Sequence, residues 1–183
     1  MSLFHIQIDG LDAIFVHIPK TGGTSIRKNR QISNVRLFDP DPQWPKDVPH
    51  FTVLRNPFDR AESAWRDFRF LRPMTDLDFI SFLTRFGMNA AEDQIINPRS
   101  IEHHVAPFTH SVHGLSYAAT LLRTETLDSD WDDMCSGMHC RTIKLRRERK
   151  CPDNMERAPV TLESIELVKE LYKDDYDFLE HVS

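Results

Sequence analysis

The sequence has few of the residues that brace small secreted folds: among its 183 residues it has three cysteines and six glycines. The cysteines are odd in number and lie close together, which argues against a disulfide framework and predicts a reducing, cytoplasmic location. No apolar run approaches the ~18 residues of a membrane-spanning helix, so no membrane association is expected. The N-terminus lacks a basic segment followed by an apolar one, so no secretory signal is expected.

An excess of positive charge is also lacking. The chain has 23 Lys and Arg against 28 Asp and Glu, a formal net charge of -5 at pH 7 with His neutral. The overall field would therefore not attract nucleic acid or another acidic polymer, and no nucleic-acid partner is expected. A hydrophobic content of 40% and a charged content of 28% are ordinary for a globular protein. The length predicts a single domain over residues 1–183.

The most informative stretch is an apolar run that leads into a glycine turn. Residues 13–18 form an apolar run, interrupted by His17 and rich in β-branched side chains, as in a buried strand of a parallel sheet. Pro19 ends the strand because proline has no N–H to donate, and Gly22-Gly23 permits a tight turn. A strand, a glycine turn and a helix start bring N–H groups and the positive end of a helix together, which predicts an anion site.

The side chains around this turn favour a phosphate. Lys20 adds a full positive charge, and Thr21, Thr24 and Ser25 add hydroxyl groups, of which the last two can also cap the helix. The order differs from the P-loop motif G-x-x-x-x-G-K-[ST], because Lys20 precedes both glycines. The alternative interpretation is an ordinary strand-to-helix turn whose glycines serve only the geometry.

A second motif follows another buried-strand candidate, residues 51–54. Arg55 comes directly after it, at the end of the strand where open α/β sheets bind ligands. Asn56 is a good N-cap, Pro57 suits the first helical position, and Ser63 lies two turns into the predicted helix. Arginine offers a planar fork and serine a hydroxyl, a pair that can bind a second phosphate.

The two motifs resemble those of one family. His17-Ile18-Pro19-Lys20-Thr21-Gly22-Gly23-Thr24-Ser25 resembles the 5′-phosphosulfate loop of sulfotransferases that use 3′-phosphoadenosine 5′-phosphosulfate (PAPS), in their carbohydrate branch. Arg55-Asn56-Pro57-Phe58-Asp59-Arg60-Ala61-Glu62-Ser63-Ala64-Trp65 resembles the 3′-phosphate motif of the same enzymes. Residues 121–127 and 161–179 resemble that branch more weakly. In the alternative interpretation, Arg55 pairs with Asp59 or Glu62 and Ser63 is a surface residue.

The resemblance implies an enzyme that moves the sulfuryl group of PAPS to an acceptor hydroxyl on a carbohydrate or another small molecule. Lys20 would be catalytic, and PAPS and its product 3′-phosphoadenosine 5′-phosphate (PAP) would bind without a metal. Residues 144–150 are basic and stand where family members carry a loop that closes over the nucleotide. Animal relatives are Golgi membrane proteins, so with no anchor visible we expect a microbial member. The nucleotide-binding residues implied are Lys20, Thr21, Gly22, Gly23, Thr24, Ser25, Arg55 and Ser63.

The general base is left open by the sequence. The family uses His or Glu, often between the two phosphate motifs, and this segment contains His50 and no glutamate. His50 is therefore a candidate, although it lies at the start of the predicted strand rather than at its end. Rival candidates are His103, His104, Asp39 and Asp41, whereas His17 is interpreted as structural.

Strands that alternate with helices predict an α/β fold, and the resemblance implies a P-loop-like three-layer α/β/α sandwich with a central parallel sheet. The helix after Arg55 should end near Leu71. The other expected elements are helices over residues 24–31, 76–86 (stopped by Gly87), 128–135 and 161–180, and strands over 34–38 and 118–122. Residues 97–113 are expected to form a loop or a broken helix, and residues 39–45 and 144–159 are expected to be irregular.

Three alternatives to a sulfotransferase stay open. A non-catalytic module that binds 3′-phosphoadenosine nucleotides would keep Lys20, Arg55 and Ser63 but lack a base. A P-loop nucleotide kinase is disfavoured by the position of Lys20 and by a predicted strand that ends at Arg123 rather than at an aspartate for magnesium. A zinc site could use Cys135, His139, Cys140 and Cys151, but their spacing fits no common pattern, so buried free thiols are the simpler interpretation.

Overall fold

The computed structural model describes residues 2–38, 47–91, 97, 99–146, 152 and 154–182. The chain divides into two compact units, Met1–Leu54 with His113–Lys150, and Arg55–Val112 with Cys151–Ser183. The described strands all belong to the first unit, and the described part of the second unit is helical. The single domain over residues 1–183 stays a prediction.

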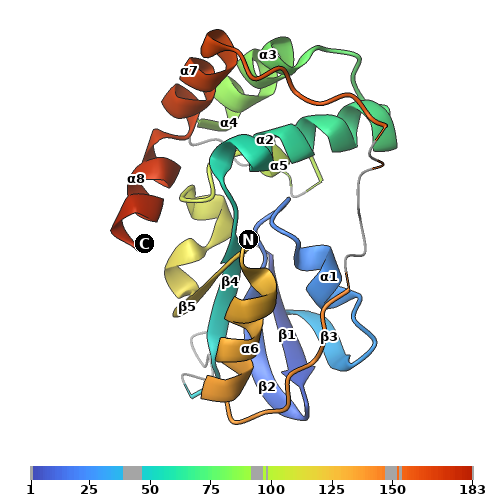
Figure 1. Ribbon diagram of the computed structural model, residues 1–183, viewed down its shortest axis with the longest axis vertical. Helices are drawn as coiled ribbons and strands as arrows, with labels where there is room; N and C mark the ends of the chain where they lie inside the picture. The colour runs from blue at the N-terminus through green and yellow to red at the C-terminus, as the bar shows by residue number, and fades with distance from the viewer. Residues whose placement is uncertain are drawn as a thin grey trace. The chain divides into compact units, whose positions relative to one another are not determined.

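The sheet of the first unit has five strands in the order β3-β1-β2-β4-β5 (Figure 1). β2 is parallel to β4 and β4 to β5, whereas β1 is antiparallel to both β2 and β3. β1 alone therefore runs against the other four. The α/β class is confirmed, but the sheet is mixed, so the expectation of a parallel sheet is wrong at β1. The strands are β1 (Leu3–Ile8), β2 (Leu11–Val16), β3 (Ile32–Phe38), β4 (His50–Leu54) and β5 (Thr120–Arg123).

β1 has no counterpart among the expected elements, although the chain carries a signal for it. Asp9 and Gly10 join Ile8 to Leu11 and have φ angles of 50° and 85°. Two successive residues with positive φ form the mirror-image turn that matches the twist of a hairpin, and Asp-Gly is a preferred pair for it. Ile6 and Ile8 of β1 are fully buried, so the hairpin adds to the core rather than standing apart from it.

One face of the sheet carries the core of the first unit. The ring of Phe15 in β2 stacks on Phe51 in β4 at 5.1 Å, and Phe51 meets the edge of Trp131 at 5.8 Å. Trp131 lies on α6 (Leu127–Gly137), which confirms the helix expected over residues 128–135. β5 likewise confirms the strand expected over 118–122, displaced slightly toward Arg123.

α1 (Gly23–Arg27) contributes Ile26 to the same core cluster, so α1 and α6 pack on one face of the sheet. This helix is shorter than expected. The Asn29 side chain accepts the N–H of Gln31 at 2.9 Å and turns the chain into β3, which begins at Ile32. The segment 39–45, which was expected to be irregular, lies outside the described residues.

The described helices of the second unit gather around one apolar cluster, to which Trp65, Phe68 and Phe82 belong. They are α2 (Pro57–Arg66), α3 (Phe79–Phe82), α4 (Met88–Ala91), α5 (Ile101–Val105), α7 (Leu162–Leu171) and α8 (Lys173–His181), with wider π turns η1 (Asp67–Leu71) after α2 and η2 (Leu83–Gly87) after α3. Two 3-10 turns, η3 (Ser111–His113) and η4 (Leu115–Tyr117), precede β5 in the chain.

α2 begins as the sequence predicts. The Asn56 side chain accepts the N–H groups of Phe58 at 2.9 Å and Asp59 at 3.4 Å, and Pro57 occupies the first helical position. The helix continues through η1 to Leu71, the expected end. α5 also confirms that residues 97–113 contain a broken helix.

The helix expected over residues 76–86 differs at both ends. Asp78 accepts the N–H of Ser81 at 2.9 Å, so the helix starts at Phe79. Gly87 does not stop it, because α4 follows at once. A Cβ atom on Gly87 would lie 2.9 Å from Cδ1 of Leu171, so this glycine permits close helix packing instead.

The helix expected over residues 161–180 is two helices. Thr161 and Ser164 form a reciprocal cap at the start of α7, as Thr161 predicts. The break falls at buried Tyr172, whose hydroxyl donates to the carbonyl oxygen of Val105 at 2.7 Å. In α8, the buried Asp175 carboxylate accepts the N–H groups of Phe108 and Thr109 at 2.8 and 3.0 Å, which fixes the chain after α5. Among the described residues, no helix is long and apolar enough to span a membrane.

Candidate functional site

The loop between β2 and α1 has an unusual backbone. Lys20 has a φ of 70° and Gly22 a φ of 92°, whereas Thr21 between them is not left-handed. A side chain at a left-handed position costs of order 1 kcal/mol or more, so Lys20 is held there by its surroundings. Turns of this kind aim successive N–H groups into one concavity, which suits an anion. Lys20 is half-buried and brings its charge to the same loop.

Thr21 shapes this loop from the inside. Its side chain is fully buried, and its hydroxyl donates to the carbonyl oxygen of Ile18 at 2.9 Å. A hydroxyl has one proton to donate, so this contact competes with the expected donation from Thr21 to a phosphate. The side chain of Thr21 therefore acts as a brace in this structure, and its contribution to an anion site would come from its backbone N–H.

Gly23 is required by the ring of His17. A Cβ atom at Gly23 would lie 2.3 Å from Cδ2 and 2.8 Å from Nε2 of that ring. The His17 ring in turn meets Phe4 at 5.9 Å and Phe15 at 5.6 Å, both edge to face. These contacts support the structural interpretation of His17, which holds the glycine turn against β2.

The helix that follows the loop is capped by its backbone. Gly22 is the N-cap, without a side-chain hydrogen bond, so the expectation that Thr24 or Ser25 caps the helix is wrong. Ser25 instead donates its N–H to the carbonyl oxygen of Gly22 at 2.9 Å. Since α1 has five residues, its dipole is small, and anion attraction would depend on the loop N–H groups and Lys20.

Thr124 ties the loop to the neighbouring strand, a role that the sequence did not reveal. Its Oγ1 lies 2.9 Å from the carbonyl oxygens of both Thr21 and Leu54, and its N–H donates to Leu54 at 2.8 Å. Thr124 follows β5 directly, so three parallel strands meet the loop at one edge. The signal in the sequence is the strand-end Arg123-Thr124-Glu125, but nothing local indicates a contact with a residue 103 positions away.

His50 lies at the opposite edge of the sheet. It is the first residue of β4 and pairs with Ile14, whereas the loop follows the end of β2. At ~3.3 Å per residue, His50 lies about 13 Å along the strand from Leu54. Burial lowers the pKa of His50, which favours its neutral form. The protonation state thus suits a base, but the position counts against His50 as the general base.

The second motif lies in the other unit, where Arg55 directly precedes the Asn56 cap of α2. Arg55 and Ser63 are both half-buried. Glu62, one of the two carboxylates considered as partners of Arg55, accepts the N–H of Ala158 at 3.1 Å and a proton of Arg157 at 3.3 Å. These contacts hold the Glu62 carboxylate against the segment that precedes α7.

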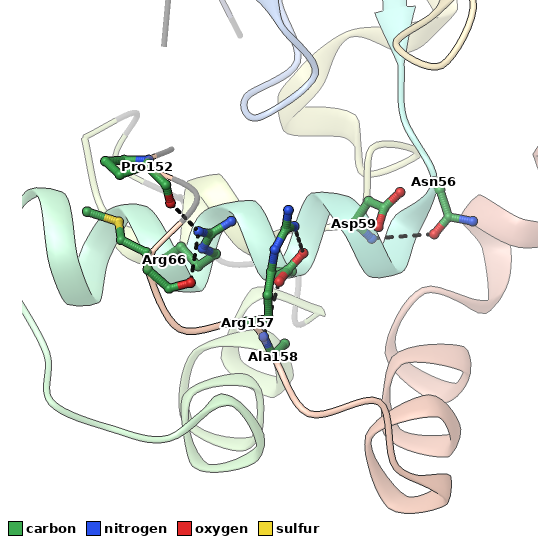
Figure 2. A network of polar contacts seen from close by, with 8 residues as sticks. Asn56, Asp59, Arg66, Pro152, Arg157 and Ala158 are labelled. Carbon is green, nitrogen blue, oxygen red and sulfur yellow. Dashed lines mark hydrogen bonds and ion pairs between the residues drawn. The ribbon is translucent and has the colours of Figure 1, made fainter. Parts of the chain in front are cut away.

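A buried arginine anchors the same face of α2. Arg66 donates from Nη2 to the carbonyl oxygens of Pro152 and Met155, at 3.2 and 3.4 Å (Figure 2). One helical turn earlier, Glu62 accepts from Arg157 and Ala158, both of which are labelled in Figure 2. Two turns of α2 are therefore fastened to the segment that precedes α7, which would keep Ser63 on a rigid helix.

The rival histidines take part in the packing of the second unit. His104 Nδ1 lies 2.8 Å from the carbonyl oxygen of Ser100, its Nε2 lies 3.5 Å from Arg72, and its ring meets the edge of Phe68 at 5.1 Å. His103 is 2% exposed. Burial, together with the neighbouring His104, lowers the pKa of His103 to about 4. Both side chains have structural surroundings, and Asp39 and Asp41 lie outside the described residues.

No metal centre is assigned. Among the residues that the structure describes, no group of three or more His, Cys, Asp and Glu side chains is arranged to hold an ion. Cys151, one of the zinc ligands considered above, lies outside the described residues.

Comparisons with protein-family models, with curated proteins and with solved structures find no match to this chain.

The contact between Gly23 and His17 predicts a destabilised Gly23→Ala variant. The added methyl group must displace the His17 ring, at a cost of about 2 kcal/mol in the free energy of unfolding. Urea denaturation measures this loss in the free energy of unfolding. Gly137→Ala is the matched control, because its Cβ would meet nothing within 4 Å at the end of α6. That control should be neutral or more stable, and equal losses in both variants would contradict the role given to Gly23.

The lowered pKa of His103 predicts a stability that falls in acid. The pKa of His103 is about 4 in the folded chain against 6.5 for an ordinary histidine, so its contribution to stability is complete above pH 6.5 and is lost as the pH falls toward 4. The expected loss is about 3 kcal/mol. Urea unfolding at pH 7 and pH 4.5 should show a shallower decline for His103→Leu than for wild type, whereas His181→Gln, an exposed control, should follow wild type. Parallel declines in all three chains would refute the assignment.

Proposed function

We propose that this chain is a PAPS-dependent sulfotransferase with a P-loop-like, three-layer α/β/α arrangement. The observation that carries the proposal is the loop after β2, where Lys20 and Gly22 hold positive φ angles around a buried Thr21. An arrangement of this kind collects N–H groups and one lysine for an anion. The resemblance of this loop and of the Arg55 motif to the two phosphate-binding motifs of the family supplies the rest of the argument.

The proposed reaction places the developing negative charge at the loop. The acceptor oxygen attacks the sulfur of PAPS in line, a new S–O bond forms, and the S–O bond to the 5′-phosphate breaks. The acceptor proton passes to a base, and PAP leaves with the electron pair of the broken bond. Lys20 and the loop N–H groups stabilise that leaving oxygen, as an oxyanion site does. The hydroxyl groups of Thr24 and Ser25 would bind the remaining 5′-phosphate oxygens.

The 3′-phosphate is assigned to the start of α2. Arg55 offers two parallel N–H donors and Ser63 a hydroxyl, a combination that distinguishes a 3′-phosphate from a free ribose hydroxyl. The Asn56 cap and the contacts of Glu62 and Arg66 support this assignment, because they fix the helix that carries Ser63. PAPS is the co-substrate, PAP the product, and no metal is proposed. A cytoplasmic location and a carbohydrate or small-molecule acceptor belong to the same proposal.

A second candidate function is a non-catalytic module that binds 3′-phosphoadenosine nucleotides. It is favoured by one observation, the position of His50 at the far edge of the sheet from the loop. His103 and His104 take part in packing, so none of the three candidate histidines is assigned as the general base. A nucleotide kinase remains disfavoured, because β5 ends at Arg123 rather than at an aspartate.

Lys20→Ala tests the proposed chemistry. The loss of one charge that stabilises the leaving oxygen should lower the turnover of PAPS by ~10²–10³-fold. The assay offers PAPS with a panel of sugar acceptors and measures the rate at which PAP is released. Lys28→Ala is the matched control, since Lys28 is exposed just after α1, and should keep wild-type turnover. Undiminished turnover in Lys20→Ala would overturn the role of Lys20, and no turnover in wild type would favour the binding module.

Arg55→Ala tests the assignment of the 3′-phosphate. Removing a charged hydrogen-bond donor should weaken PAP binding by about 2 kcal/mol, or ~30-fold, and leave adenosine 5′-phosphate binding nearly unchanged. Titration calorimetry with both nucleotides gives the ratio. Arg85→Ala, an exposed arginine of the same unit, serves as the control. Equal losses for the two nucleotides in Arg55→Ala would show that Arg55 does not read the 3′-phosphate.

A further inference from the structure

The end of α6 brings two cysteines together through its backbone. Cys140 donates its N–H to the carbonyl oxygen of Cys135, and His139 donates to Ser136, each at 3.0 Å. His139 has a φ of 56°. A left-handed residue with these two nested hydrogen bonds is the Schellman arrangement of a helix C-terminus. Its geometry characteristically brings the side chains of the two outer residues into contact, and here both are cysteines.

The two cysteine side chains belong to one part of the core. The cap joins the backbones of Cys135 and Cys140, and the Cys140 side chain packs against the apolar cluster that includes Cys135. Cys135 is fully buried in the core cluster that contains Trp131 and Ile143, whereas Cys140 is partly exposed at its margin. Cys140 is therefore the more exposed of the two residues, and Cys135 is closed off from solvent.

The surroundings set the order in which the thiols react. Burial, followed by the effect of the Cys140 thiol, raises the pKa of Cys135 to about 12. Cys135 is therefore protonated and a poor first nucleophile, because the thiolate is the reactive form. Cys140, with its greater exposure, is the group that can meet a reagent first.

We propose that Cys135 and Cys140 form a reversible disulfide by exchange with a low-molecular-weight disulfide such as oxidised glutathione. The Cys140 thiolate attacks one sulfur of the reagent, a mixed disulfide forms and one glutathione thiolate leaves. Cys135 then attacks the Cys140 sulfur while losing its proton, and the second glutathione thiolate leaves. The two protein thiols are oxidised and the reagent is reduced to two thiols, which take up the released protons. This inference is independent of the proposed nucleotide chemistry.

The test uses the wild-type chain, treated with oxidised glutathione under native conditions, then alkylated and cleaved with trypsin. Cleavage after Arg123 and Arg141 places both cysteines in one peptide and Cys151 in another. We expect that peptide to lack two hydrogens and to carry no alkyl group. The disulfide should form at least about tenfold more extensively in the folded chain than in guanidinium, where the thiols are no longer held together.

Two results would overturn the proposal. One is a stable mixed disulfide on Cys140 with Cys135 still alkylated, and the other is a link from this peptide to that of Cys151. Cys135→Ala is the control and should stop at the mixed disulfide on Cys140. Because Cys135→Ala alters the core, Cys140→Ser gives a second control, which should leave Cys135 unmodified by glutathione.

The cap geometry can be tested separately at the exposed His139. Glycine is the preferred residue at this left-handed position, whereas a β-branched residue is strained there. His139→Gly should form the disulfide at least as fast as wild type, and His139→Val more slowly. Identical rates in the two variants would contradict the role of the cap in bringing the thiols together.

Discussion

The backbone between Lys20 and Gly23 is the constraint on which the candidate site depends. Two left-handed residues are held there because Thr21 is fastened to Ile18 from inside and Gly23 lies against the His17 ring. Neither contact involves a ligand, so the loop has this shape in the protein alone. Preorganisation of this kind lowers the cost of binding an anion, since the N–H groups need no rearrangement when it arrives.

The parallel part of the sheet gives this loop its place. β2, β4 and β5 run in one direction, so their carboxyl ends lie at one edge, and Thr124 joins the loop to that edge. Ligands of open α/β sheets bind at carboxyl edges, which is the physical basis of the functional proposal. The same rule weakens the case for His50 as the general base, because His50 is the first residue of β4 and pairs with Ile14, at the other end of the strand.

Local chemistry made much of the fold predictable. The cap at Asn56, the proline after it, the reciprocal cap at Thr161 and the apolar strands each depend on residues close in sequence. The signal for β1 is also local, because Asp9-Gly10 favours a hairpin turn. The strand itself shows no continuous apolar run, which is why it was not predicted. Long-range effects were not predictable: Thr124 meets Thr21, and Gly87 packs on Leu171 instead of ending a helix. For the site, sequence spacing indicated the glycine loop but not that Thr21 faces inward.

The central claim is that the chain binds a nucleotide through both a 5′- and a 3′-phosphate. The most direct measurement is calorimetric titration of the wild-type chain with PAP, with adenosine 5′-phosphate and ATP with magnesium as comparisons. We expect PAP to bind at least about tenfold more tightly than either of the other nucleotides. Equal binding of PAP and adenosine 5′-phosphate, a preference for ATP with magnesium, or no binding of any nucleotide would contradict it.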